Sequence, residues 1–123
     1  MGRPESNFWQ YWKKNTPNIS WTRIENTTTL GTPDLLGYNK NNIFFTVELK
    51  VSKRKHIKFS PHQIAFHVKH PINSFILVQT PEACGLKLYE GKRIRELVAC
   101  GLELDACCLG LDACRSRLEL LGA

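Results

Sequence analysis

Two acids and a lysine lie close together in the stretch GTPDLLGYNKNNIFFTVELKV. Asp34 and Glu48 are separated by thirteen residues, and Lys50 follows Glu48 by two. Both acids lie on or beside strand-like segments, where an ionised carboxylate is costly to bury unless something offsets the cost. Two neighbouring carboxylates repel unless a cation lies between them or one is protonated. Mg²⁺ accepts such oxygen ligands, and a metal-bound water beside a lysine suits phosphodiester hydrolysis. The alternative is a structural ion pair, with Asp34 capping a turn.

Strand geometry explains how these residues could meet. The sequence predicts strands at Asp34–Tyr38 and Ile43–Val51, joined by an Asn-rich turn at residues 39–42. Such a hairpin pairs residue 34 with about residue 47, which brings the two acids together. Residues two apart point to the same face of a strand, so Glu48 and Lys50 project together. We therefore expect both acids and the lysine at one end of a sheet.

A helix follows, expected at Pro61–His70. Ser60 and Gln63 have the spacing of a capping box, with Pro61 at the first helical position. Ile64, Ala65 and Val68 are expected to form its buried face. The remaining expected elements are a helix over residues 4–14, strands at Ile19–Asn26 and Ser74–Gln79, a hairpin of Leu86–Tyr89 and Arg93–Leu97, and a helix near Leu111–Leu121. This order predicts an α/β fold with an α-β-β-β-α-β core, a mixed central sheet and a small C-terminal hairpin and helix addition.

Positive charge is concentrated after Lys50. The chain of 123 residues has a net charge of +6, and no acid occurs between Glu48 and Glu82. A phosphate backbone would be attracted to such a stretch, although a solvated basic loop is the alternative. The stretch carries six basic residues and all four histidines: Lys50, Lys53, Arg54, Lys55, Lys58, Lys69, His56, His62, His67 and His70.

Five cysteines lie in the last third of the chain, at positions 84, 100, 107, 108 and 114. The number is odd, zinc-type CxxC spacing is absent, and no histidine follows His70, so buried reduced thiols are favoured over a metal site. The start of the chain has no apolar segment typical of a signal peptide. We expect a cytoplasmic protein, acting in the host cytoplasm if it is phage-encoded. One domain is expected over residues 1–123, with a core at about residues 4–80 and an addition at about residues 84–123.

The motif Gly31-Thr32-Pro33-Asp34, followed by Glu48-Leu49-Lys50, resembles the signature of the PD-(D/E)XK nuclease superfamily. The order of helix, three strands, helix and strand is similar to that superfamily's core. The compact size looks most like small phage-type members, which are related to archaeal Holliday-junction resolvases and the VRR-NUC group. The resemblance extends from about Glu5 to Gln79.

The resemblance implies metal binding by Asp34 and Glu48, with a contribution from the Leu49 carbonyl. Glu5 on the leading helix matches an additional acid that many members carry, and it would complete the site or bind a second ion. The cofactor would be Mg²⁺ or Mn²⁺.

Lys50 would position or activate the attacking water. Gln63 would orient Lys50 or the water, although the capping box explains this glutamine without catalysis. His62 and His67 are expected to face phosphate or to be structural, rather than to act as general bases. Lys13 and Lys14 could extend the DNA surface. The expected DNA-binding residues are Arg23, Ser52, Lys53, Arg54, Lys55, Lys58, Ser60 and His62.

The implied activity is that of a metal-dependent endodeoxyribonuclease selective for branched DNA such as a Holliday junction. A homodimer would match the two-fold symmetry of a junction, and no membrane is involved. The alternatives are a nuclease of replication or repair that acts on flaps or duplexes, and a non-catalytic nucleic-acid-binding module with the same fold. An unrelated small protein with a chance motif is a further alternative.

Overall fold

A six-stranded sheet forms the centre of the protein, with the strands in the order β1-β2-β3-β4-β5-β6. The computed structural model describes residues 4–24, 31–82 and 85–123, and the side chains of residues 6 onward within them. Strands β3 and β4 pair in parallel, whereas the other neighbours are antiparallel. The elements are α1 (Pro4–Lys14), β1 (Ser20–Arg23), β2 (Leu35–Tyr38), β3 (Phe44–Val51), α2 (Pro61–Lys69), β4 (Ser74–Gln79), β5 (Leu86–Glu90), η1 (Gly91–Arg93), α3 (Ile94–Cys100), η2 (Gly101–Glu103), β6 (Cys108–Leu109) and α4 (Leu111–Glu119).

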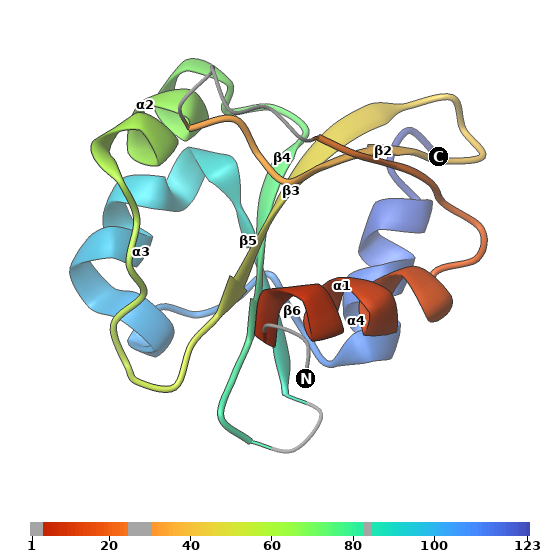
Figure 1. Cartoon of the computed structure of the whole chain (residues 1–123). Helices are drawn as coiled ribbons and strands as arrows, with labels where there is room; N and C mark the ends of the chain where they lie inside the picture. The colour runs from red at the N-terminus through yellow and green to blue at the C-terminus, as the bar shows by residue number, and fades with distance from the viewer. Residues whose placement is uncertain (1–3, 25–30, 83–84) are drawn as a thin grey trace.

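Helices cover both faces of the sheet, with α1 and α4 on one side and α2 and α3 on the other (Figure 1). The mixed sheet and the predicted α-β-β-β-α-β order are confirmed. Successive residues of β3 point to opposite faces, so Phe45, Val47 and Leu49 join the core beneath α1 and α4. The intervening residues, among them Glu48 and Lys50, therefore face α2. In the described residues, no helix is long and apolar enough to cross a membrane.

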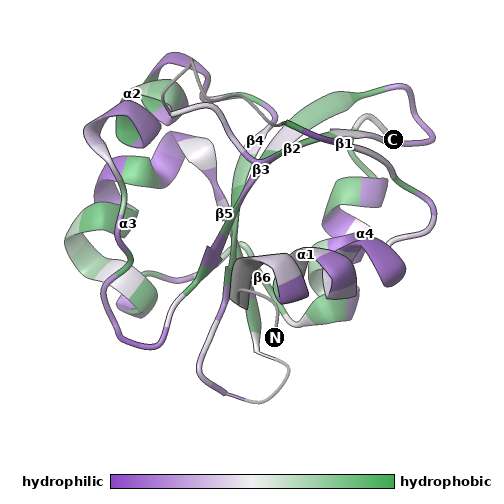
Figure 2. Ribbon diagram, in the orientation of Figure 1, coloured by the Kyte–Doolittle hydropathy of each residue, from purple (hydrophilic) through white to green (hydrophobic). Residues whose placement is uncertain are grey.

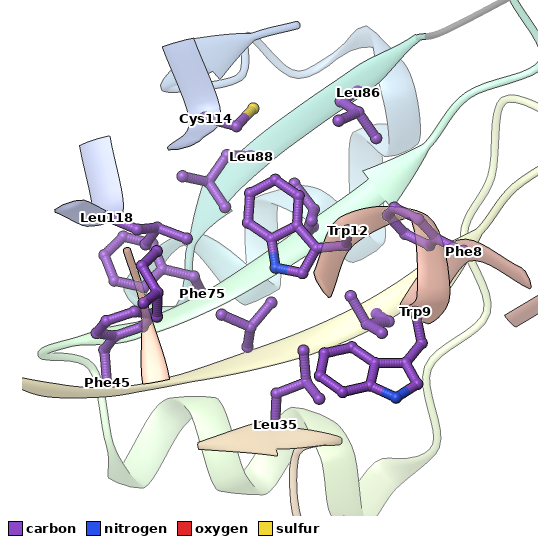
Figure 3. Close-up of a cluster of buried hydrophobic side chains, with 14 residues drawn as sticks. Phe8, Trp9, Trp12, Leu35, Phe45, Phe75, Leu86, Leu88, Cys114 and Leu118 are labelled. Carbon is purple, nitrogen blue, oxygen red and sulfur yellow. The ribbon is translucent and has the colours of Figure 1, made fainter. Parts of the chain in front are cut away.

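Aromatic side chains of α1 fill the core on the first face (Figure 3). Trp12 is fully buried, and Phe8 and Trp9 are nearly so. Trp21 of β1 packs edge-on against Trp9 and Phe45, with ring centroids 6.4 and 5.5 Å apart. Truncation of such a buried aromatic residue costs about 3–5 kcal/mol. The packing of α1 therefore stabilises the sheet, and the acids of the motif lie on the opposite face of that sheet.

Asn39 links the β2–β3 turn to α4. Its Oδ1 accepts hydrogen bonds from the N–H groups of Asn41 and Ile43, at 2.9 and 3.1 Å. Its Nδ2 donates to the carbonyls of Leu118 and Leu121, both at 2.9 Å. One buried side chain thus bonds both to the turn and to carbonyls at and just after the C-terminal end of α4, about eighty residues away in sequence.

The second predicted hairpin is wrong. Leu86–Glu90 is a strand, but Arg93–Leu97 lies within η1 and the helix α3. Ile94 and Leu97 are both buried in the second core cluster, three residues apart. This spacing suits one face of a helix rather than the alternation of a strand.

Two expectations about burial also need correction. On α2, Ile64 packs against the core, but Ala65 and Val68 are exposed, and the helix buries His67 instead. Among the described cysteines only Cys114 is fully buried, whereas Cys100 and Cys107 are exposed and Cys108 is half-buried. All four are free thiols, and burial raises the pKa of Cys114 to about 12. Cys84 lies outside the described residues.

Candidate active site

The register of β2 and β3 brings Asp34 beside Glu48. Leu35 pairs with Val47, so the next residues outward, Asp34 and Glu48, lie opposite each other. The sequence prediction had placed residue 34 opposite about residue 47, one position away. Asp34 continues the pairing on its other side as well, because its carbonyl accepts from the N–H of Ile24 at 2.8 Å. Its backbone is therefore held between two neighbouring strands.

The Asp34 carboxylate is tied directly to β3. Its Oδ2 accepts a hydrogen bond from the N–H of Leu49 at 2.8 Å. In a strand, the N–H and C=O of one residue point to the same neighbouring strand. The Leu49 carbonyl is therefore directed to the side of the sheet where Asp34 lies, as the sequence resemblance implied for a metal ligand.

Glu48 and Lys50 face α2 and meet there at one side chain. Glu48 is 3% exposed. The Gln63 amide lies between the two charges: Nε2 donates to Glu48 Oε2 at 3.4 Å, and Oε1 accepts from Lys50 Nζ at 3.1 Å. Lys50 Nζ also lies 4.8 Å from the centre of the Phe59 ring. The structure thus brings Asp34, Glu48, Lys50 and Gln63 together, and it adds Phe59, which the sequence analysis missed.

Gly31 explains how the loop before Asp34 reaches α2. Its φ of +83° lies in the left-handed region, which favours glycine. A side chain at this position would overlap the backbone of His62 in the first turn of α2. Glycine therefore allows the loop to pack against the helix that carries Gln63. The motif contained this residue, but its contact across the fold could not be read from the sequence.

The donor atoms offered here are oxygens. Asp34 and Glu48 provide carboxylates, and Leu49 provides a carbonyl on the Asp34 side. Within the part of the chain that the structure describes, no group of three or more His, Cys, Asp and Glu residues is arranged to hold a metal. An incomplete set of oxygen ligands suits Mg²⁺, which usually keeps several waters. Glu5 lies on α1, but its side chain is outside the described residues.

Most basic residues of the expected DNA surface lie in the loop from β3 to α2. The loop from β3 to α2 is largely hydrophilic (Figure 2). Arg23 is exposed on β1, and its partner is Leu35, next to Asp34. Lys13 and Lys14 lie elsewhere, because α1 leads to Ser20, which pairs with Tyr38 at the turn end of β2. The other exposed residues of the expected DNA surface are Lys53, Arg54, Lys55, Lys58, Ser60 and His62.

Ser52 differs from the rest of the expected DNA-binding set. It is 6% exposed, and its hydroxyl donates to the Arg54 carbonyl at 2.6 Å. The hydroxyl therefore folds the loop rather than facing solvent. The loop is fixed from outside as well, since Leu102 N–H donates to the Lys55 carbonyl at 2.8 Å and Gly101 packs against that carbonyl. No local pattern in the sequence indicated this contact between the basic loop and η2.

His67 is structural, one of the two roles expected from the sequence. It is fully buried, and its Nδ1 lies 2.8 Å from Ser74 Oγ. Burial, together with the nearby His70 and Lys50, lowers the pKa of His67 to about 4. The ring is therefore neutral at physiological pH and lies away from any phosphate at the surface.

The solved structures that share this fold include the following two. One is Hjc, a Holliday junction resolvase from the archaeal hyperthermophile Archaeoglobus fulgidus, with a TM-score of 0.54 and 13% identity over 73% of this chain and 75% of that chain. The other is a VRR_NUC domain, with a TM-score of 0.53 and 21% identity over 80% of this chain and 97% of that chain. No protein-family model and no curated protein sequence matches the chain. The two neighbours represent the groups that the sequence motif indicated, so the predicted resemblance is confirmed at the level of the fold.

Proposed function

We propose that this chain is a metal-dependent endodeoxyribonuclease that hydrolyses phosphodiester bonds in branched DNA such as a four-way junction. The observation that carries the proposal is the meeting of Asp34, Glu48 and Lys50 at one end of the sheet, with the Gln63 amide between Glu48 and Lys50. A buried carboxylate beside a second acid is costly unless a cation offsets the desolvation and the repulsion. A divalent cation bound by these two acids would do so.

Asp34, Glu48 and the Leu49 carbonyl would hold Mg²⁺ or Mn²⁺, with Glu5 as a further acid. When bound, such an ion supplies positive charge at a phosphate oxygen and lowers the pKa of a bound water. Lys50 would hold the attacking water and balance charge on the phosphate. Gln63 would keep the lysine directed toward the acids. Attack of the water on phosphorus would break one P–O ester bond and leave a phosphomonoester and a hydroxyl end.

The basic residues around the site would contact the DNA backbone. Lys53, Arg54 and Lys58 lie in the loop that leaves β3, while Arg23 and His62 lie on elements beside Asp34. All five are exposed. Contacts of this kind give affinity without sequence readout and weaken as salt rises. We expect the protein to bind DNA by backbone shape and charge.

Selectivity for a junction is supported by the fold shared with a Holliday junction resolvase. A four-way junction has two-fold symmetry, and a symmetric homodimer would present two sites to two opposed strands. We therefore propose that the active form is a homodimer that acts on DNA in the cytoplasm, the host's if the gene is phage-borne.

A cleavage assay tests the proposal. Four-way junctions, flaps, splayed arms and plain duplex are incubated with the protein in Mg²⁺, Mn²⁺ or EDTA. Glu48→Ala and Lys50→Ala should abolish cleavage, whereas the exposed Lys40→Ala, at the other end of the β2–β3 hairpin, should cleave normally. Cleavage that survives both site substitutions would refute the mechanism. Binding without cleavage under every metal would identify a non-catalytic module, and preference for flaps or duplex would identify a replication or repair nuclease.

A further inference from the structure

We propose that Phe59 and Ser60, the two residues before α2, are positioning residues for the candidate active site. Ser60 fixes the Gln63 amide through the helix cap, and Phe59 fixes the Lys50 ammonium. Neither residue needs to touch the substrate for this role. The inference rests on the proposed function for its catalytic consequence, but the positioning itself can be measured without metal or DNA.

The helix cap and the site share one amide. Ser60 Oγ accepts from the Gln63 N–H at 3.1 Å, and the Ser60 N–H donates to Gln63 Oε1 at 3.0 Å. These two bonds form a reciprocal capping box. The same Oε1 accepts from Lys50 Nζ at 3.1 Å, and the amide nitrogen faces Glu48. The sequence left open whether Gln63 caps the helix or serves the site, and the same side-chain amide makes both sets of contacts.

Hydrogen-bonding chemistry allows only one orientation of this amide. The Ser60 backbone N–H and the Lys50 ammonium can only donate, whereas an ionised Glu48 carboxylate can only accept. A rotated amide would direct its NH₂ group at two donors and its oxygen at a carboxylate. The cap therefore determines which end of the Gln63 amide faces Glu48 and which faces Lys50.

Phe59 acts on the same lysine from the other side. The ammonium lies over the ring at 4.8 Å from its centre, within the range of a cation–π interaction. Phe59 itself packs against the core cluster beneath α2 and α3, together with Ile57. A ring anchored in the core can orient the cation without an additional acid that would neutralise it. Lys50 is thus held between Phe59 and an amide fixed by the neighbouring Ser60.

Substitutions can separate positioning from stability. Ser60→Gly removes the hydroxyl, yet glycine at an N-cap costs helix stability only a few tenths of a kcal/mol. Glycine keeps the Ser60 N–H that donates to Gln63 Oε1, but without the hydroxyl the reciprocal bond from the Gln63 N–H is lost and this donor is held less firmly. We expect kcat for junction cleavage to fall several-fold with little change in KM, because the hydroxyl is engaged by the Gln63 N–H and not by the DNA in this arrangement. Ser60→Thr, which keeps the hydroxyl, should restore most of the kcat. Phe59→Leu should lower kcat about fivefold, whereas Ile57→Ala, a loss of apolar volume in the same cluster, should not.

The metal-free protein provides an independent readout. In ¹⁵N-labelled protein, the side-chain amide signal of Gln63, assigned by its loss in Gln63→Glu, should differ from that of an exposed glutamine and exchange slowly with water. Ser60→Gly should move it toward the exposed value, and Ser60→Thr should not. A Gln63 signal that is unchanged by Ser60→Gly, or a lower Tm without a lower kcat, would overturn the inference. An inactive wild-type protein whose Gln63 signal responds to Ser60 would refute the proposed nuclease and support the positioning role.

Discussion

The buried neutral state of His67 predicts a measurable loss of stability in mild acid. An unfolded chain protonates this histidine near its ordinary pKa of 6.5, whereas the folded protein does so only near about 4. As the pH falls through this window, the unfolded state gains a proton that the folded state does not bind. The stabilising contribution is therefore complete above about pH 6.5 and is lost progressively down to about pH 4.

The size of the effect follows from the shift in pKa. A difference of about 2.5 pKa units corresponds to about 3 kcal/mol over the whole window, of which about 2 kcal/mol is lost by about pH 5. Urea unfolding at about pH 7.5 and pH 5 measures the loss. His67→Asn keeps a polar side chain near Ser74 but does not titrate. Between these two pH values, the free energy of unfolding of this variant should therefore fall by about 2 kcal/mol less than that of the wild type.

His62→Asn is the matched control, because His62 is exposed in the first turn of the same helix. It should show the same dependence on pH as the wild type. If His67→Asn and the wild type lost equal stability between the two pH values, the reasoning from burial would be refuted.

Three further predictions concern other parts of the fold. Asn39→Ala should lower the free energy of unfolding by about 3 kcal/mol, because it removes four hydrogen bonds of a buried side chain. The exposed Asn41→Ala should cost under about 1 kcal/mol, and urea unfolding compares the two variants. Gly101→Val should weaken DNA binding several-fold, because a side chain there displaces the Lys55 carbonyl and with it the basic loop. Fluorescence anisotropy in EDTA measures the affinity, and an unchanged affinity would contradict the idea that η2 holds the basic loop in place. Arg54→Gln should lower the slope of log affinity against log salt by about 1, and an unchanged slope would exclude a phosphate contact.

The sequence predicted the elements around the site well because their signals are local. Ser60, Pro61 and Gln63 specify the start of α2 within four residues, and the structure contains the full capping box. The Asn-rich turn predicted the register of the β2–β3 hairpin to within one residue. Alternation along β3 then determined that Glu48 and Lys50 share a face.

Other features depended on contacts that no local pattern contains. His67 is buried because α2 turns it toward Ser74, although histidines in a basic stretch more often face water. Ser52 lies in a run of polar residues, yet the loop closes over it. The helix α3 is a different case, because the spacing of Ile94 and Leu97 is a local signal for a helix. The preceding Glu90 and Gly91 are typical of a hairpin turn, and they favoured the incorrect prediction of a second strand.

The link between Asn39 and α4 also has a consequence for how the protein folds. The β2–β3 hairpin is local and can form early, but the buried Asn39 amide gains its carbonyl partners only when residues 118–121 dock. Contacts between such distant positions form late, because a long loop must close first. Loss of α4 would in turn leave a buried amide without partners. We therefore expect the amides of the β2–β3 turn to exchange with solvent only when the whole sheet unfolds, and to report global rather than local opening.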